Sequence, residues 1–134
     1  MRLRPFTEDK PKPLVPVNGR PIAELQIEWL KSAKIDSVTF LCGYRWERLK
    51  EHFGTSYNGV NVDYSVEESP LGTGGAIRKA LPNIPSGEEN VVLMNGDVIT
   101  DLDLANMIRS HTAPSTPSSA SILLVPYKSR FGIV

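Results

Sequence analysis

The feature that most constrains this chain is the alternation of short apolar runs with segments of helical spacing. The apolar, β-branched runs predict strands, and they occupy residues 37–43, 60–66, 90–97 and 121–127. Apolar residues recur at helical spacing in the segments between or before them, at 21–33, 44–54, 72–81 and 102–111. Because helix-length connections join the strands, the pattern predicts an α/β fold with a mostly parallel, doubly wound sheet.

Length and charge narrow the class of protein. The 134 residues suit one domain, 1–134, and Lys plus Arg balance Asp plus Glu at 15 each. This balance indicates neither a nucleic-acid nor a membrane partner, and no apolar run approaches the length of a membrane span. The single cysteine, Cys42, lies in an apolar run, where it is expected to be a buried strand residue rather than a nucleophile. We expect a cytoplasmic protein.

Basic residues gather in the opening segment "MRLRPFTEDKPKPLVPVNGRP". Arg2 and Lys12 stand ten residues apart in a loop punctuated by prolines. Arginine offers a planar fork and lysine a compact charge for phosphate oxygens. Taken alone, two basic residues near a terminus are usually just solvated charges.

A glycine-rich segment, "EESPLGTGGAI", follows the second predicted strand. The strand ends at Glu67, and Gly72 opens a run that becomes helical. Glycines allow close approach of a ligand, and a helix N-terminus favours an anion or a polar ring edge. The spacing does not match the dinucleotide-binding fingerprint, and on this segment alone we prefer the simpler interpretation of a tight strand-to-helix turn.

An acidic residue follows the third predicted strand in "VVLMNGDVITD". The carboxylate of Asp97 should emerge at the tip of that strand, where a hard oxygen ligand could hold Mg²⁺ against substrate phosphates. The alternative is a loop or helix cap, and we prefer that reading for Asp101 and Asp103, which precede the segment "LANMIRSH".

Taken together, these segments resemble the sugar-1-phosphate nucleotidyltransferase family, and within it the mannose-1-phosphate guanylyltransferase-like branch. The resemblance rests on "RLRPFTEDKPKPLVPVNGRPI", "ESPLGTGGAI", "LMNGDVITDLDL" and "FGIV", in this order. It implies a Rossmann-like nucleotidyltransferase fold with helices on both faces of the sheet. It also implies transfer of a nucleotidyl group from a nucleoside triphosphate to a sugar 1-phosphate, with release of pyrophosphate.

The resemblance also implies roles for individual residues. Arg2 and Lys12 would be catalytic, Asp97 would bind Mg²⁺, and Glu67, Gly72 and Thr73 would bind the nucleotide. Glu67 stands where the family reads the base. A carboxylate only accepts hydrogen bonds, and guanine presents two adjacent donors, so GTP is favoured over UTP or dTTP.

In the family, a strand and a glycine-rich phosphate loop precede the position of Met1, so we expect this chain to lack both. Such a gap would leave neighbouring strands unpaired, and a second copy could fill it, which predicts a homo-oligomer. We therefore expect the nucleotide-binding part of a catalytic domain. The alternatives are a non-catalytic nucleotide- or sugar-phosphate-binding module of the same fold, and an unrelated phosphate-binding α/β domain.

Overall fold

The computed structural model describes residues 7, 9–115 and 118–124. The chain forms two compact units, residues 1–101 and 102–134. The first unit contains the sheet, the first three α-helices and every candidate site residue. The second unit contains the last helix. Arg2 and the "FGIV" segment lie outside the described residues.

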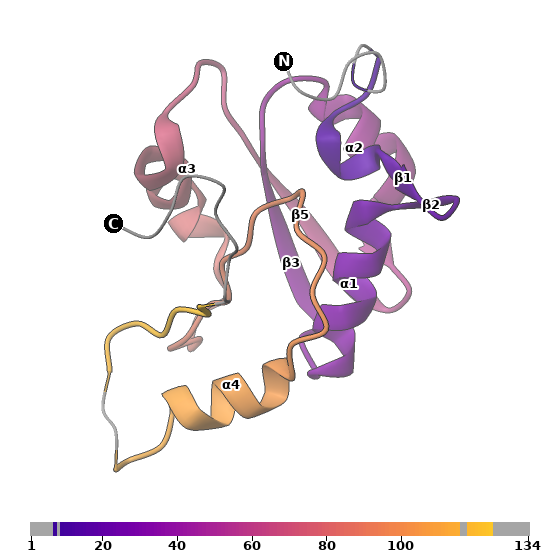
Figure 1. The fold of residues 1–134 in the computed structure, drawn as a ribbon. Helices are drawn as coiled ribbons and strands as arrows, with labels where there is room; N and C mark the ends of the chain where they lie inside the picture. Colours follow the sequence, from indigo (N-terminus) through magenta and orange to yellow (C-terminus); the bar gives the residue numbers. More distant parts are fainter. Residues whose placement is uncertain (1–6, 8, 116–117, 125–134) are drawn as a thin grey trace, which may run out of the picture. The chain divides into compact units, whose positions relative to one another are not determined.

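A three-stranded sheet in the order β3–β5–β4 forms the centre of the first unit (Figure 1). β3 (Ser37–Cys42) and β5 (Val60–Val66) are parallel, with Val38 opposite Val62 and Phe40 opposite Tyr64. The short strand β4 (Ser56–Tyr57) adds to β5 in the antiparallel direction. The α/β class expected from the sequence is confirmed, and the observed sheet is mixed.

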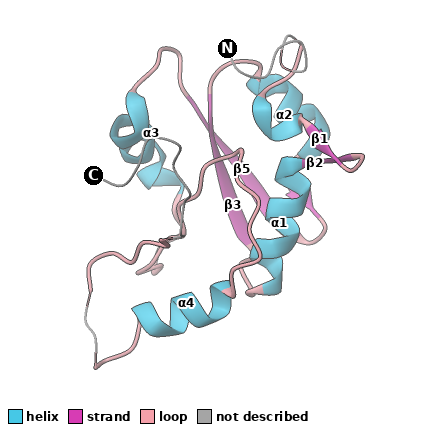
Figure 2. Ribbon diagram, viewed as in Figure 1, coloured by secondary structure: helices cyan, strands magenta, loops and turns pink. Residues whose placement is uncertain are grey.

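Helices cover both faces of this sheet (Figures 1 and 2). α1 (Ile22–Ser32) and α2 (Trp46–Phe53) lie on one side, and α3 (Gly72–Ala80) lies on the other. The bounds of all three agree with the helical segments expected from the sequence to within two residues. Gly54 ends α2 with a φ of 62°, a backbone angle that glycine adopts without steric cost.

The hydrophobic core lies between the β3–β5 pair and the helices α1 and α2. Alternate residues of β5 point into it, and the helices contribute stripes spaced by about one turn, as the 3.6-residue period requires. Its buried members are Ala23, Ile27, Leu49, Phe53, Val60 and Val62. The rings of Phe40 and Phe53 are 5.4 Å apart, a spacing typical of attractive aromatic pairs.

Two tight hairpins, not anticipated from the sequence, share the dipeptide Asn-Gly. Asn18 and Gly19 join β1 (Pro16–Val17) to β2 (Arg20–Pro21), and Asn58 and Gly59 join β4 to β5. All four turn residues have a φ between 50° and 81°. Two consecutive positive φ angles define the two-residue turn that matches the twist of antiparallel strands.

Two short 3₁₀ helices complete the first unit, η1 (Lys12–Leu14) and η2 (Leu81–Asn83). The second unit contains α4 (Leu104–His111), as expected from the sequence. The carboxylate of Asp103 accepts a hydrogen bond of 2.9 Å from the backbone N–H of Asn106, which confirms Asp103 as a helix cap. No helix in the described part of the chain is long and apolar enough to cross a membrane.

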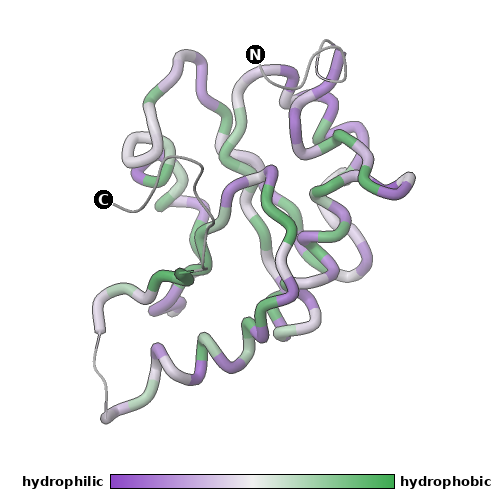
Figure 3. The backbone as a smooth tube through the Cα atoms, viewed as in Figure 1, coloured by the Kyte–Doolittle hydropathy of each residue, from purple (hydrophilic) through white to green (hydrophobic). Residues whose placement is uncertain are grey.

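The strand expected at 90–97 was a wrong prediction, because this segment is a loop that ends in a turn at 96–97 and belongs to no sheet. Its side chains are not buried either, since Val91, Val92 and Leu93 are 54%, 38% and 59% exposed. Figure 3, which colours the backbone by hydropathy, shows hydrophobic stretches in this part of the chain. A strand requires a partner for its backbone groups as well as apolar side chains, and no described strand pairs with this segment. Residues 121–124 likewise form no strand, while 125–127 lie outside the described residues.

Candidate functional site

Lys12 and Asp97 meet in the folded chain although 85 positions separate them. The Lys12 Nζ lies 3.3 Å from the Asp97 Oδ2, and both side chains are partly exposed, at 57% and 42%. An exposed ion pair of this kind contributes at most about 1 kcal/mol to stability. The two charges are therefore close together and still accessible to a ligand.

The turn that carries Asp97 is held against the rest of the unit from two sides. Gln26 of α1 donates hydrogen bonds to the backbone carbonyls of Asn95 and Val98. On the other side, Gly96 packs against Pro13 of η1, so closely that a methyl group on Gly96 would lie 3.0 Å from the Pro13 Cγ. Because Pro13 follows Lys12, the same contact brings the lysine beside the carboxylate.

Glu67 lies at the carboxyl end of β5, next to the end of β3. Its backbone N–H donates a 2.7 Å hydrogen bond to the carbonyl of Cys42, which continues the parallel pairing by one residue. Its side-chain Oε2 accepts a hydrogen bond of 3.1 Å from the backbone N–H of Leu71. One carboxylate oxygen thus closes the loop before α3, and the other oxygen has no hydrogen-bond role in that loop.

Gly72 and Thr73 are the first residues of α3, and both are exposed. Gly72 has a φ of 69°, an angle that a residue with a side chain adopts only with strain. The first backbone N–H groups of a helix lack partners within that helix. This helix start therefore offers hydrogen-bond donors close to Glu67. Such donors are what a ligand-binding turn at this position would need.

The thiol of Cys42 does not belong to the candidate chemistry. Burial raises its pKa to about 11, and the nearby carboxylates of Glu67 and Glu47 contribute to the rise. Because the thiolate is the nucleophilic form, this cysteine is unreactive near neutral pH, in agreement with its expected structural role.

The sequence-predicted residues thus form two groups, each built by its own contacts. Lys12 and Asp97 are brought together by η1 and the turn at 95–98, and Glu67, Gly72 and Thr73 are brought together by the loop from β5 to α3. The sequence interpretation missed Gln26. The sequence contained one indication of its importance: Gln26 is polar at a position where the helical period predicts an apolar residue.

A carboxylate such as Asp97 fits the requirements of a Mg²⁺ ligand. Mg²⁺ prefers oxygen donors and is usually held by one or two carboxylates together with water and substrate phosphates, and Asp97 presents its oxygen on an exposed turn. Within the described ranges, no group of three or more His, Cys, Asp or Glu side chains is arranged to hold a metal ion.

The model of the nucleotidyl transferase family matches residues 1–134. The chain belongs to this family. It is 38% identical over 135 residues to D-glycero-alpha-D-manno-heptose 1-phosphate guanylyltransferase of Aneurinibacillus thermoaerophilus, an alignment that covers 99% of this chain and 57% of that protein. It is 32% identical over 136 residues to the mannose-1-phosphate guanyltransferase of Pichia angusta, covering 99% of this chain and 37% of that protein.

One solved structure supports the fold. The crystal structure of HddC from Yersinia pseudotuberculosis complexed with GMP-PN matches with a TM-score of 0.69 and 29% identity, over 84% of this chain and 49% of that one. The chain therefore spans about half the length of the heptose 1-phosphate guanylyltransferase and of HddC, and 37% of the mannose-1-phosphate guanyltransferase. The family and fold implied by the sequence resemblance are confirmed.

Two neighbouring glycines at the start of α3 should respond oppositely to alanine. A methyl group on Gly75 would lie 2.7 Å from the Leu71 Cβ, whereas one on Gly74 would meet nothing within 4 Å. We expect Gly74→Ala to be neutral or to stabilise by about 0.5–1 kcal/mol, and Gly75→Ala to destabilise by about 1–3 kcal/mol because Leu71 must move. Urea unfolding of the two variants measures the difference, and equal stabilities would show that this loop is not tightly packed.

Proposed function

We propose that this chain is the nucleotide-binding part of a sugar-1-phosphate guanylyltransferase. The observation that carries the proposal is the 3.3 Å approach of Lys12 to Asp97. An ammonium for phosphate oxygens and a carboxylate for a metal ion, both accessible, are the two charges that joining a triphosphate to a sugar phosphate requires. Family membership and the names of the relatives support the same reaction.

In the proposed reaction, an oxygen of the sugar 1-phosphate attacks the α-phosphorus of GTP. The bond from that phosphorus to the bridging oxygen breaks, and pyrophosphate leaves. Lys12 would hold the α-phosphate and the sugar phosphate in place and offset their mutual repulsion. Arg2, outside the described residues, would contact the triphosphate near its leaving end.

Asp97 would hold the Mg²⁺ that accompanies the nucleotide. When bound, the ion supplies charge neutralisation of phosphate oxygens. The Asp97 carboxylate would then turn from the Lys12 ammonium toward the ion, and Lys12 would turn toward phosphate. Both side chains are free to do so, because each is exposed and their pairing is weak.

The base is proposed from the chemistry of Glu67, and the sugar from the names of the relatives. Glu67 would read guanine with its carboxylate, beside the exposed start of α3, where Gly72 and Thr73 would border the nucleotide. The two relatives are named for sugars of the manno series, so we favour a manno-configured sugar 1-phosphate as the acceptor. We place the reaction in the cytoplasm, where such substrates would be available.

Removing either charge of the pair should abolish the function with little effect on the fold. We expect Lys12→Ala and Asp97→Ala each to weaken calorimetric binding of GTP with Mg²⁺ by about tenfold or more and to suppress pyrophosphate release. Stability to urea should change by less than about 1 kcal/mol. Lys79→Ala and Asp101→Ala, which remove exposed charges elsewhere, serve as matched controls.

Binding that is unchanged in both variants would contradict the assigned roles. Binding without pyrophosphate release, in the presence of mannose 1-phosphate or the corresponding heptose 1-phosphate, would favour the non-catalytic binding module over the enzyme.

The base preference depends on the charge of Glu67. In Glu67→Gln an amide replaces one acceptor oxygen by a donor, while its remaining oxygen can still accept from the Leu71 N–H. GTP affinity should therefore fall by about tenfold relative to UTP, without loss of the fold. A GTP-to-UTP ratio that stays constant would mean that Glu67 does not read the base.

We also propose that two copies of this chain associate through the segment 90–95 and the outer edge of β3. Among the described strands, β3 pairs only with β5, and the segment 90–95 exposes Val91, Val92 and Leu93. An unpaired strand edge and an extended apolar run can both be satisfied by β-pairing with a second copy.

Sedimentation at tens of micromolar should therefore show a dimer or larger species. Leu93→Asp should shift it to monomer, while Leu81→Asp, at a leucine of similar exposure in η2, should not. A monomeric unaltered chain would refute the association.

A further inference from the structure

Gln26 is a polar side chain in the buried stripe of α1. It is only 7% exposed, between Ala23 and Ile27 on the same face. Burying an amide costs free energy unless its hydrogen bonds are made. A leucine would fill the same space without this requirement, so the contacts of the amide must account for its presence.

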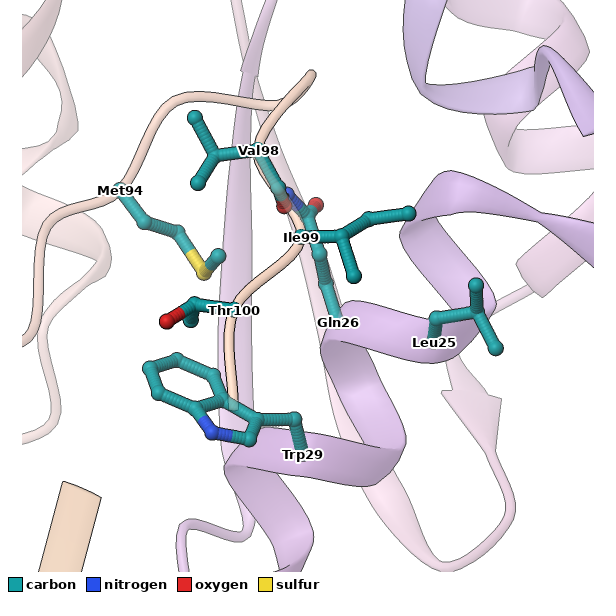
Figure 4. A pocket seen from close by; sticks show the side chains of 7 residues that line it. All are labelled: Leu25, Gln26, Trp29, Met94, Val98, Ile99 and Thr100. Carbon is teal, nitrogen blue, oxygen red and sulfur yellow. The ribbon is translucent and has the colours of Figure 1, made fainter. Parts of the chain in front are cut away.

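Both hydrogen bonds of the Gln26 amide nitrogen go to one turn. The Nε2 donates to the carbonyl of Asn95 at 2.9 Å and to the carbonyl of Val98 at 2.8 Å. Figure 4 shows the side chain of Gln26 rising from α1 to the backbone beside Val98. The N–H of Val98 itself donates to the carbonyl of Asn95 at 3.3 Å. A single side chain thus binds both ends of the turn whose middle residues are Gly96 and Asp97.

This turn lies outside the sheet of the first unit. The segment before it joins no sheet, and Val98 and Ile99 after it are 41% and 52% exposed. The cavity beside it, lined in part by Trp29 and Met94, has a volume of only about 20 Å³. The two hydrogen bonds from Gln26 thus fix the turn to a helix of the core, while the Gly96–Pro13 contact and the Lys12–Asp97 ion pair connect it to η1.

We infer that Gln26 is a positioning residue, which sets the place and direction of the Asp97 carboxylate for the metal ion that accompanies the nucleotide. The inference rests on the proposed function, in which Asp97 is the metal ligand. Gln26 touches neither nucleotide nor metal in this scheme. It acts through the backbone, because Asp97 lies between the two carbonyls that the amide holds.

The test compares Gln26→Leu with Leu30→Ala. Gln26→Leu removes both donors and keeps an apolar group of similar volume. Leu30 is equally buried, one turn along the same face of α1, so Leu30→Ala loosens the helix packing without touching the turn. Two readouts are measured on this polypeptide: hydrogen exchange of the Val98 amide, and the Mg²⁺ concentration needed for half-maximal binding of GTP.

In Gln26→Leu we expect the Val98 amide to exchange about tenfold faster or more, beyond any acceleration of the core amides of β5. The Mg²⁺ requirement should rise severalfold. In Leu30→Ala, Val98 and β5 should accelerate together, and the Mg²⁺ requirement should stay unchanged. Gln26→Glu offers the turn carbonyls an acceptor in place of a donor and should resemble Gln26→Leu.

Two results would overturn the inference. One is Val98 exchange that rises only in step with β5, which would mean that Gln26 does not hold the turn. The other is faster exchange with an unchanged Mg²⁺ requirement, which would reduce Gln26 to a structural partner of two carbonyls. A failure of the unaltered chain to bind GTP with Mg²⁺ would count against the proposed function instead, and the exchange result alone would then decide whether Gln26 fixes the turn.

Discussion

The parallel pairing of β3 with β5 is the constraint on which the rest of the first unit depends. Parallel strands end at the same edge of a sheet, so the pairing brings the end of β3 and Glu67 together, as the hydrogen bond from Glu67 to Cys42 shows. One face of the pair is buried by α1 and α2 around Phe53 and Val60. A slip of one residue would turn this apolar face toward the solvent, so burial of the core fixes the register of the two strands. The register in turn fixes the position of Glu67 beside the end of β3.

The two groups of candidate residues are supported in different ways. Glu67 and the start of α3 are near neighbours in sequence, and one hydrogen bond within the loop suffices to order them. Lys12 and Asp97 lie on segments that are far apart in sequence and only weakly paired. Their approach depends on long-range contacts, those of Gln26 with the turn carbonyls and of Pro13 with Gly96. The pair is therefore more sensitive than Glu67 to loss of these specific contacts.

Local sequence patterns predicted the helices and the strands β3 and β5, because periodicity and apolar runs report directly on burial. The same reasoning failed at 90–97. An apolar run indicates residues that favour a strand, but it does not indicate whether a partner strand is present. The hairpins at Asn18-Gly19 and Asn58-Gly59 were predictable from turn chemistry, but the search for helix-length connections passed over them. The role of Gln26 was not predictable, because its partners are 69 and 72 positions away. The grouping of Lys12 with Asp97 was foreseen only through the family resemblance.

Because Lys12 and Asp97 face each other, each serves as the counter-ion of the other until a ligand arrives. In the proposed function, a free metal ion that took the carboxylate would leave an ammonium uncompensated, and a free polyphosphate that took the ammonium would leave a carboxylate beside its own negative charge. A metal–nucleotide complex would bring both signs at once and would replace one neutral pairing by two. If the proposed function holds, the geometry would therefore favour the complete metal–nucleotide complex over either of its parts.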